Sequence, residues 1–455
     1  MMKYPGLLDE DVSRIGVQES QMLNLISGKL VTDLVKTSLG PKGMSKIYID
    51  ILDEDTLTKH GGAFLRKVDV DHPAAKSVIE AVNTVDTHVG DGTTSSAILI
   101  GSLLDNAKDL LNMGIPVTVI IKGYERSLDY TLNVLDDVKI SSNNLDQKIM
   151  KQLLVTCLDG KALFDLYESQ EKISNLMIES ISCIRDFKNN YINTDDIKIE
   201  EKIGNISETQ LIRGTILDKT IDSSAMPRSI DNPKILLINE SLETMKTKSE
   251  SEIEITSPEQ MSQFLIQENT DLEILVKKIV DADIDVVISR KGVNDFVQEA
   301  LAQKGIITIR RVKYNDLWWL EKATGAKTCK DIHKISVDEI GYAKKIYEKI
   351  IGGDKMIFVE GVNPKSVTLL LRANSKRYLD ELHRNALNGF KVLKNFIENP
   401  FIVFGAGSIE GIIAEKIRNH ASTIENKEQI VLERFANSVE EIPLTLARNI
   451  GMNVI

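Results

Sequence analysis

The sequence predicts a multi-domain protein in which mostly helical parts surround an α/β domain. The chain has 455 residues, whereas one domain usually takes about 100–200 residues. Up to about residue 207, the apolar residues recur mainly at helical spacing. From about residue 210 to 360, short aliphatic runs alternate with helical segments, as in an α/β domain. After about residue 375 the helical pattern returns, so the α/β domain is predicted to be an insertion.

Three helices and one hairpin are predicted in the N-terminal part. Apolar residues three and four apart predict the helices, and alternating polar and apolar residues predict the hairpin. Pro73 suits the first turn of the second helix, where no backbone N–H is needed. The helices are expected at residues 23–34, 73–85 and 94–113, and the hairpin strands at residues 46–51 and 56–58.

The α/β domain is predicted from five aliphatic runs of strand length. The charged stretch Met245–Gln267 is expected to be an exposed excursion from it. Further along, Phe401–Phe404 is expected to be a strand leading into a glycine loop. The five runs are Lys234–Ile238, Asp285–Ile288, Ile306–Ile309, Met356–Val359 and Val367–Leu371.

Composition excludes several classes of protein. The net charge of −11 argues against a nucleic-acid binder, which normally carries a basic face. Three cysteines far apart in the sequence favour neither a disulfide framework nor a zinc site and fit a reducing compartment. The acidic N-terminus does not resemble a signal peptide, and no apolar stretch of about 18 residues predicts a membrane span. We therefore expect a cytoplasmic protein without membrane partners.

Three glycine-bearing loops are the candidate ligand-binding segments of the sequence: Thr37–Met44, Val89–Ser95 and Gly405–Ser408. The second loop opens a predicted helix, where free N–H groups and the helix dipole favour phosphate. Its hydroxyl side chains add donors, and Asp91 suits a Mg²⁺ ion that bridges phosphate oxygens. Taken alone, each loop could also be an ordinary turn, with Asp91 and Thr93 as helix caps.

In this order, the segments resemble the group II chaperonins, the family of the eukaryotic TRiC/CCT ring and the archaeal thermosome. Gly90–Thr94 looks like the family signature Gly-Asp-Gly-Thr-Thr. Among the paralogous subunits, alpha is the most similar, through Tyr48–Lys76, and zeta competes through Asn363–Thr368. Further matches are Thr37–Met44 with the Leu-Gly-Pro-x-Gly-Met loop, His72–Lys76 with the His-Pro-Ala-Ala-Lys helix start, Leu211–Gly214 with the start of the apical domain, and Gly405–Glu410 with the Gly-Gly-Gly-Ala-x-Glu loop.

The resemblance implies a chaperonin fold with a mostly helical equatorial domain, a small intermediate domain and an α/β apical domain. It places the equatorial domain at residues 1–139 and 398–455, the intermediate domain at 140–209 and 363–397, and the substrate-binding apical domain at 210–362. ATP and Mg²⁺ are the implied cofactors, with Asp91 as metal ligand. The implied nucleotide-binding residues are Leu39, Gly40, Pro41, Asp91, Gly92, Thr93, Thr94, Ser95 and Gly407.

The sequence departs from the family at two positions that carry chemistry. His60 and Asn388 stand where the family has aspartates, which are thought to position and activate the attacking water. An asparagine amide cannot act as a general base, and a histidine has different reach and charge. We therefore expect weakened or lost hydrolysis. Two alternatives stay open: a local misalignment with Asp380 serving instead, or His60 acting as the base.

The C-terminus also departs, because the chain stops at Ile455 where the family continues and completes the equatorial core. Apolar faces of equatorial helices are then expected to be uncovered. Truncation, cover by a neighbouring subunit, and a tolerated loss of nucleotide binding all remain open. Near the hinge, Arg372 and His383 are expected to be solvated surface groups.

The expected function is an ATP-binding subunit of a cytosolic hetero-oligomeric double-ring chaperonin. Its expected partners are paralogous subunits and unfolded client polypeptides. The alternative is a structural ring subunit with little or no nucleotide binding. An unrelated phosphate-transfer enzyme is disfavoured because no lysine follows Gly90–Thr94 as in a P-loop.

Overall fold

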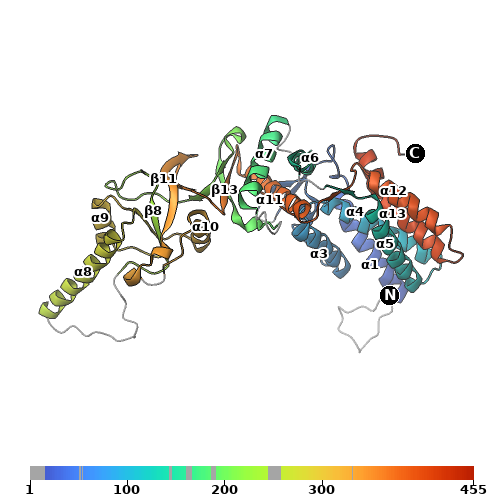
Figure 1. Cartoon of the computed structure of the whole chain (residues 1–455). Helices are drawn as coiled ribbons and strands as arrows, with labels where there is room; N and C mark the ends of the chain where they lie inside the picture. Colours follow the sequence, from blue (N-terminus) through green and yellow to red (C-terminus); the bar gives the residue numbers. More distant parts are fainter. Residues whose placement is uncertain are drawn as a thin grey trace, which may run out of the picture. The chain divides into compact units, whose positions relative to one another are not determined.

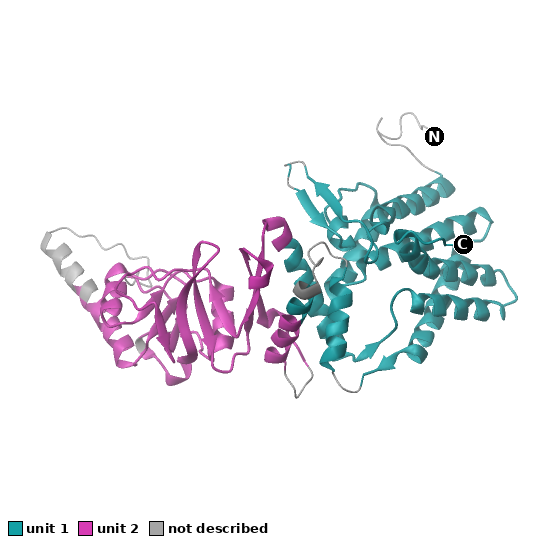
Figure 2. Cartoon of the chain, turned by 90° about the horizontal axis from the view of Figure 1, so that it is seen from above, with its two compact units in different colours: residues 1–174, 380–455 teal, residues 175–379 magenta. Residues whose placement is uncertain are grey.

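The computed structural model describes residues 16–454 apart from 51–52, 54, 143–145, 160–166, 186–190, 244–257 and 330–331. The chain divides into two compact units: unit 1 holds residues 1–174 and 380–455, and unit 2 holds residues 175–379 (Figure 2). Both boundaries fall inside the two segments expected to form the intermediate domain. The division into three domains therefore stays a prediction.

Unit 1 is mostly helical, and its long helices α1, α4, α5, α12 and α13 pack against one another (Figure 1). The predicted hairpin is present as two antiparallel strands, with Lys46 paired to Thr58. The elements are α1 (Val17–Lys36), β1 (Lys46–Ile49), β2 (Asp55–Thr58), α2 (Gly61–Leu65), α3 (Pro73–His88), α4 (Thr93–Asn112), α5 (Val117–Val138), β3 (Ile140–Ser141), α6 (Gln147–Leu158), β14 (Phe401–Ile402), α12 (Ser408–Ala421) and α13 (Glu428–Asn449). Two further helices, α7 (Tyr167–Ile184) and α11 (Lys376–Glu398), each belong partly to both units.

Unit 2 contains a seven-stranded sheet in the order β10-β9-β8-β11-β12-β6, with β7 paired to β11. Strands β8, β9 and β10 are parallel, whereas β11 runs antiparallel to its neighbours. A separate sheet has the order β4-β13-β5. The elements are β4 (Ile197–Ile203), β5 (Gln210–Ile212), β6 (Gly214–Leu217), β7 (Ser229–Asp231), β8 (Lys234–Ile238), α8 (Pro258–Asp281), β9 (Val286–Ser289), α9 (Asp295–Gln303), β10 (Ile307–Ile309), α10 (Tyr314–Thr324), β11 (Gly341–Ile351), β12 (Asp354–Gly361) and β13 (Val367–Ala373), with 3₁₀ turns at Thr194–Asp196, Ile206–Glu208, Ile332–Lys334 and Val337–Glu339.

Strand β8 shows why aliphatic runs mark the sheet of unit 2. Its alternate residues point to opposite faces. Leu236 and Ile238 belong to a buried cluster with residues of α8 and α9. Ile235 and Leu237 belong to another, with residues of α10. Both faces of this parallel part are thus covered, and a strand buried on both faces reads as a continuous apolar run.

Three expectations about individual segments need correction or fall outside the structure. The helical interpretation of the region up to residue 207 was wrong from Ile197 on, because β4 pairs in parallel with β13 there. Arg372 is 7% exposed rather than solvated, and its guanidinium donates to the Ile203 carbonyl at 2.9 Å. The Met245–Gln267 excursion lies largely outside the described residues. Among the described helices, none is long and apolar enough to cross a membrane.

Candidate functional site

The three glycine loops and the segment carrying His60 gather at one end of unit 1, and we call them the glycine-loop cluster. Helices α1 and α4 pack closely, because a Cβ at Gly28 would lie 2.7 Å from Leu104 Cδ1 and a Cβ at Gly101 would contact Thr32. Residue numbers thus rise along α1 as they fall along α4, so the two helices are antiparallel. The loop that follows α1 therefore lies at the same end as the loop that precedes α4.

Helix α13 connects the first and third loops. A Cβ at Gly40 would lie 2.6 Å from Leu446 Cδ2, and a Cβ at Gly407 would lie 2.5 Å from Pro443 Cβ. Both glycines have positive φ, so only glycine fits there without strain. Asn449 Nδ2 also donates to the carbonyl oxygen of Leu39 at 2.9 Å. The loops are thus fixed against one helix.

The second loop begins helix α4 with a left-handed glycine. Gly92 has φ +82, and a Cβ placed there would meet nothing within 4 Å. No side chain caps this helix start, so the first N–H groups of α4 have no side-chain acceptor. Helix α12 likewise begins at left-handed Gly407 without a side-chain cap. Two uncapped helix starts in one cluster suit an anionic ligand.

Both ring nitrogens of His60 lie close to other protein groups. Nδ1 accepts the N–H of Ala63 at 3.2 Å and so caps α2. Nε2 lies 3.4 Å from Asp86 Oδ1 and 3.5 Å from Thr93 Oγ1. Since Nδ1 accepts, the proton of the neutral ring belongs on Nε2, and this tautomer is assigned from the hydrogen bonds. The ring then has no free lone pair with which to act as a base.

Asn388 lies in the buried face of α11, next to the second loop. A Cβ at Gly90 would lie 2.7 Å from Lys391 Cβ and 3.2 Å from the Asn388 carbonyl oxygen. The Asn388 side chain is 5% exposed. Asp380 lies eight residues earlier, about 12 Å along the helix at 1.5 Å per residue. Asp380 therefore lies farther along α11 from the second loop than Asn388 does.

Several polar groups around these residues were missed by the sequence reasoning. Asp86 is buried, and its carboxylate pairs with Arg66 as well as with His60. Asn385 is fully buried, and neither its amide nitrogen nor its amide oxygen has a hydrogen-bond partner among the described residues. Lys59 Nζ donates to the carbonyl oxygen of Pro41 at 2.9 Å and so connects the His60 segment to the first loop. A spacing pattern could not have found them, because they come together only through the packing of α3, α11 and the loops.

The cluster fits a magnesium-bound polyphosphate. Gly92, Thr93 and Gly407 would hold the phosphates with backbone N–H groups and a hydroxyl, and half-exposed Asp91 would hold the metal. When bound, the metal would neutralise phosphate charge. Thr93 is 2% exposed, and its Oγ1 accepts the Gly62 N–H at 3.2 Å, so its position is fixed before a ligand arrives.

The link between α1 and α13 should depend on pH. Burial raises the pKa of Glu441, but hydrogen bonds from Lys36 and Arg448 outweigh this effect and lower it below 4.5. A lowered pKa stabilises the fold above the unfolded pKa, and the gain is lost as pH falls through the folded pKa. We expect Glu441→Gln to reduce the free energy of urea unfolding at pH 7, with the difference shrinking below about pH 4. An equal difference at pH 3 and pH 7 would contradict this.

Comparison with known proteins shows the family of the chain. The TCP-1/cpn60 chaperonin family matches residues 31–455. A thermosome subunit of Pyrococcus horikoshii is 36% identical over 453 residues, which cover 99% of this chain and 82% of the relative. Thermosome subunit alpha of Sulfurisphaera tokodaii is 37% identical over 460 residues, which cover 99% of this chain and 82% of that subunit. Thermosome subunit beta of Archaeoglobus fulgidus is 36% identical over 453 residues, with 99% and 83% covered. The chain therefore belongs to the TCP-1/cpn60 chaperonin family and is a group II chaperonin subunit.

Proposed function

We propose that this chaperonin subunit binds ATP with Mg²⁺ at the glycine-loop cluster. The observation that carries the proposal is the uncapped start of α4 at Gly92, which has open space where a side chain would be. The first and third loops are held beside it through α1 and α13. Leu39, Gly40 and Pro41 would line the nucleotide from one side and Thr94 and Ser95 from the other.

The proposal also holds that this site hydrolyses ATP slowly or not at all. Water attack needs a group that accepts its proton. Asn388 offers an amide, which is not basic, and the Nδ1 lone pair of His60 accepts the Ala63 N–H. Asp86 is paired with Arg66. The residues at the two family aspartate positions can therefore orient a ligand but supply no proton acceptor.

We also propose its partners, by analogy with the family. The subunit takes a place in a double ring with paralogous subunits, in the cytoplasm, and assists unfolded polypeptides through the apical part of unit 2. ATP binding can drive a change in the ring only when nucleotide prefers one conformation over the other. Slow hydrolysis would hold this subunit longer in the nucleotide-bound conformation than its neighbours.

Fluorescent-nucleotide titration of the whole chain tests the proposal. We expect saturable Mg²⁺-dependent binding and at least about a tenfold loss of affinity in Asp91→Ala, which corresponds to about 1.4 kcal/mol. Asp129→Ala, which removes an exposed carboxylate on α5, is the matched control and should bind as the parent does. Absence of binding in all three proteins would favour the alternative, a structural ring subunit.

A further inference from the structure

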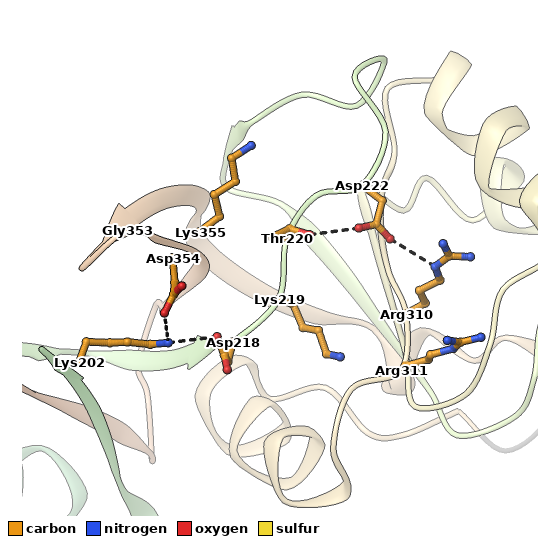
Figure 3. A pocket seen from close by; sticks show the side chains of 10 residues that line it. All are labelled: Lys202, Asp218, Lys219, Thr220, Asp222, Arg310, Arg311, Gly353, Asp354 and Lys355. Atoms are coloured by element: carbon orange, nitrogen blue, oxygen red, sulfur yellow. Dashed lines mark hydrogen bonds and ion pairs between the residues drawn. The ribbon is translucent and has the colours of Figure 1, made fainter. Parts of the chain in front are cut away.

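Unit 2 holds a polar pocket of about 630 Å³, which the proposed function does not use (Figure 3). It lies where four segments meet: the end of β4, the residues after β6, the turn between β11 and β12 with the first residues of β12, and the residues after β10. Its volume falls within the usual range for small-molecule sites of about 300–1,000 Å³, but its lining is charged rather than apolar. The basic residues that line it are Lys202, Lys219, Arg310, Arg311 and Lys355.

The acidic residues of the pocket form ion pairs with only two of these basic residues. Lys202 Nζ pairs with Asp354 at 2.8 Å and with Asp218 at 3.4 Å. Arg310 pairs with Asp222 at 3.3 Å. These are the three carboxylates of the pocket lining. The remaining basic side chains are thus left without a carboxylate from the pocket itself.

Lys219 and Arg311 are the two cations without a partner. Neither side chain has an ion pair or a hydrogen bond to any residue that the structure describes, and Figure 3 draws both without a dashed line. Lys355, the fifth cation, reaches only Glu348, at 3.7 Å. Unpaired positive charge therefore collects in one pocket of a chain whose net charge is −11.

Arg311 is also held in a costly backbone conformation. Its φ is +57, in the left-handed region that arginine rarely adopts. The segment is fixed on both sides, because the Arg311 N–H donates to Lys291 O at 3.0 Å and the Val312 N–H donates to Ser289 O at 3.1 Å. Backbone strain of this kind gathers at ligand sites, where the surrounding structure fixes it.

We propose that this pocket binds a compact phosphate-type oxyanion, with Arg311 and Lys219 as its ligands. Guanidinium groups bind oxyanions through paired N–H donors, and an ammonium adds a point charge. None of the described residues that line the pocket is aromatic, so they offer no ring on which a nucleotide base could stack. The three carboxylates of its lining would repel a long polyanion, which favours a small ligand. The phosphate could be inorganic or part of a small organic molecule.

Calorimetric titration of the whole chain with tripolyphosphate, with inorganic phosphate and with glycerol phosphate tests the proposal. Arg311→Gly removes the guanidinium and relieves the left-handed strain, so the melting temperature should not fall. Affinity for tripolyphosphate should fall about ten- to a hundredfold. Lys219→Ala should lower the affinity as well. Lys304→Ala, which removes an exposed charge of the same unit outside the pocket, is the matched control and should bind as the parent does.

Three results would overturn the proposal. The first is equal affinity in the parent and Arg311→Gly. The second is a loss of tripolyphosphate binding in Asp91→Ala while Arg311→Gly binds as the parent does, which would place the anion in the glycine-loop cluster. The third is Arg311-dependent binding of a glutamate-rich peptide that tripolyphosphate does not displace, which would make polypeptide carboxylates the ligand. Tighter binding of glycerol phosphate than of inorganic phosphate would favour an organic phosphate as the source.

Discussion

Restoring both family carboxylates, by His60→Asp together with Asn388→Asp, is expected to raise the rate of ATP hydrolysis by about 10²–10⁴-fold. A positioned general base contributes about that much to a reaction. An aspartate at position 60 can also keep the cap on α2, because aspartate is among the preferred N-cap residues. The rate is measured in a single-turnover assay with excess protein, so that product release does not limit it.

The matched control moves the new carboxylate one helical turn along α11. His60→Asp with Asn385→Asp adds the same charge to the same buried helix face, but next to a different part of the site. We expect no comparable gain from it. Equal rates in the two double variants would show that position 388 has no special role. A parent rate already equal to that of a competent chaperonin would refute the proposal of weak hydrolysis.

The sequence predicted strands well where they are aliphatic and poorly where they are charged. Lys234–Ile238 is a strand as expected, since both of its faces are buried. Strand β11, Gly341–Ile351, was missed, because it carries three lysines and a glutamate. Pairing with β12 and β7 decides its structure, and local propensity does not reveal such pairing.

The loops of the candidate site could be predicted from the sequence, but the contacts between their side chains could not. The glycines of the second loop could be identified from the sequence, because only a residue without a Cβ takes positive φ without strain. The capping role of His60 and its contact with Asp86 could not be identified, because residues 60 and 86 meet only in the tertiary structure. The similarity to the alpha subunit stays a prediction.

Lys198→Met is expected to lower the free energy of unfolding of unit 2 by about 3–5 kcal/mol, because it leaves a buried carboxylate without its partner. Lys198 is 6% exposed and Asp316 is 8% exposed. Lys198 Nζ donates to Asp316 Oδ1 and to the Ile216 carbonyl, each at 2.6 Å. Both tryptophans of the chain belong to α10, so their fluorescence during urea unfolding reports on this unit.

Lys202→Met is the matched control, because it removes the same charge four residues along the same strand. Its partners Asp218 and Asp354 are 59% and 62% exposed, so water can solvate them when the lysine is gone. The expected cost is about 1 kcal/mol or less. The double variant Lys198→Met with Asp316→Leu should recover most of the lost stability, because it removes both buried charges. Equal costs for Lys198→Met and Lys202→Met would mean that burial does not govern the strength of this pair.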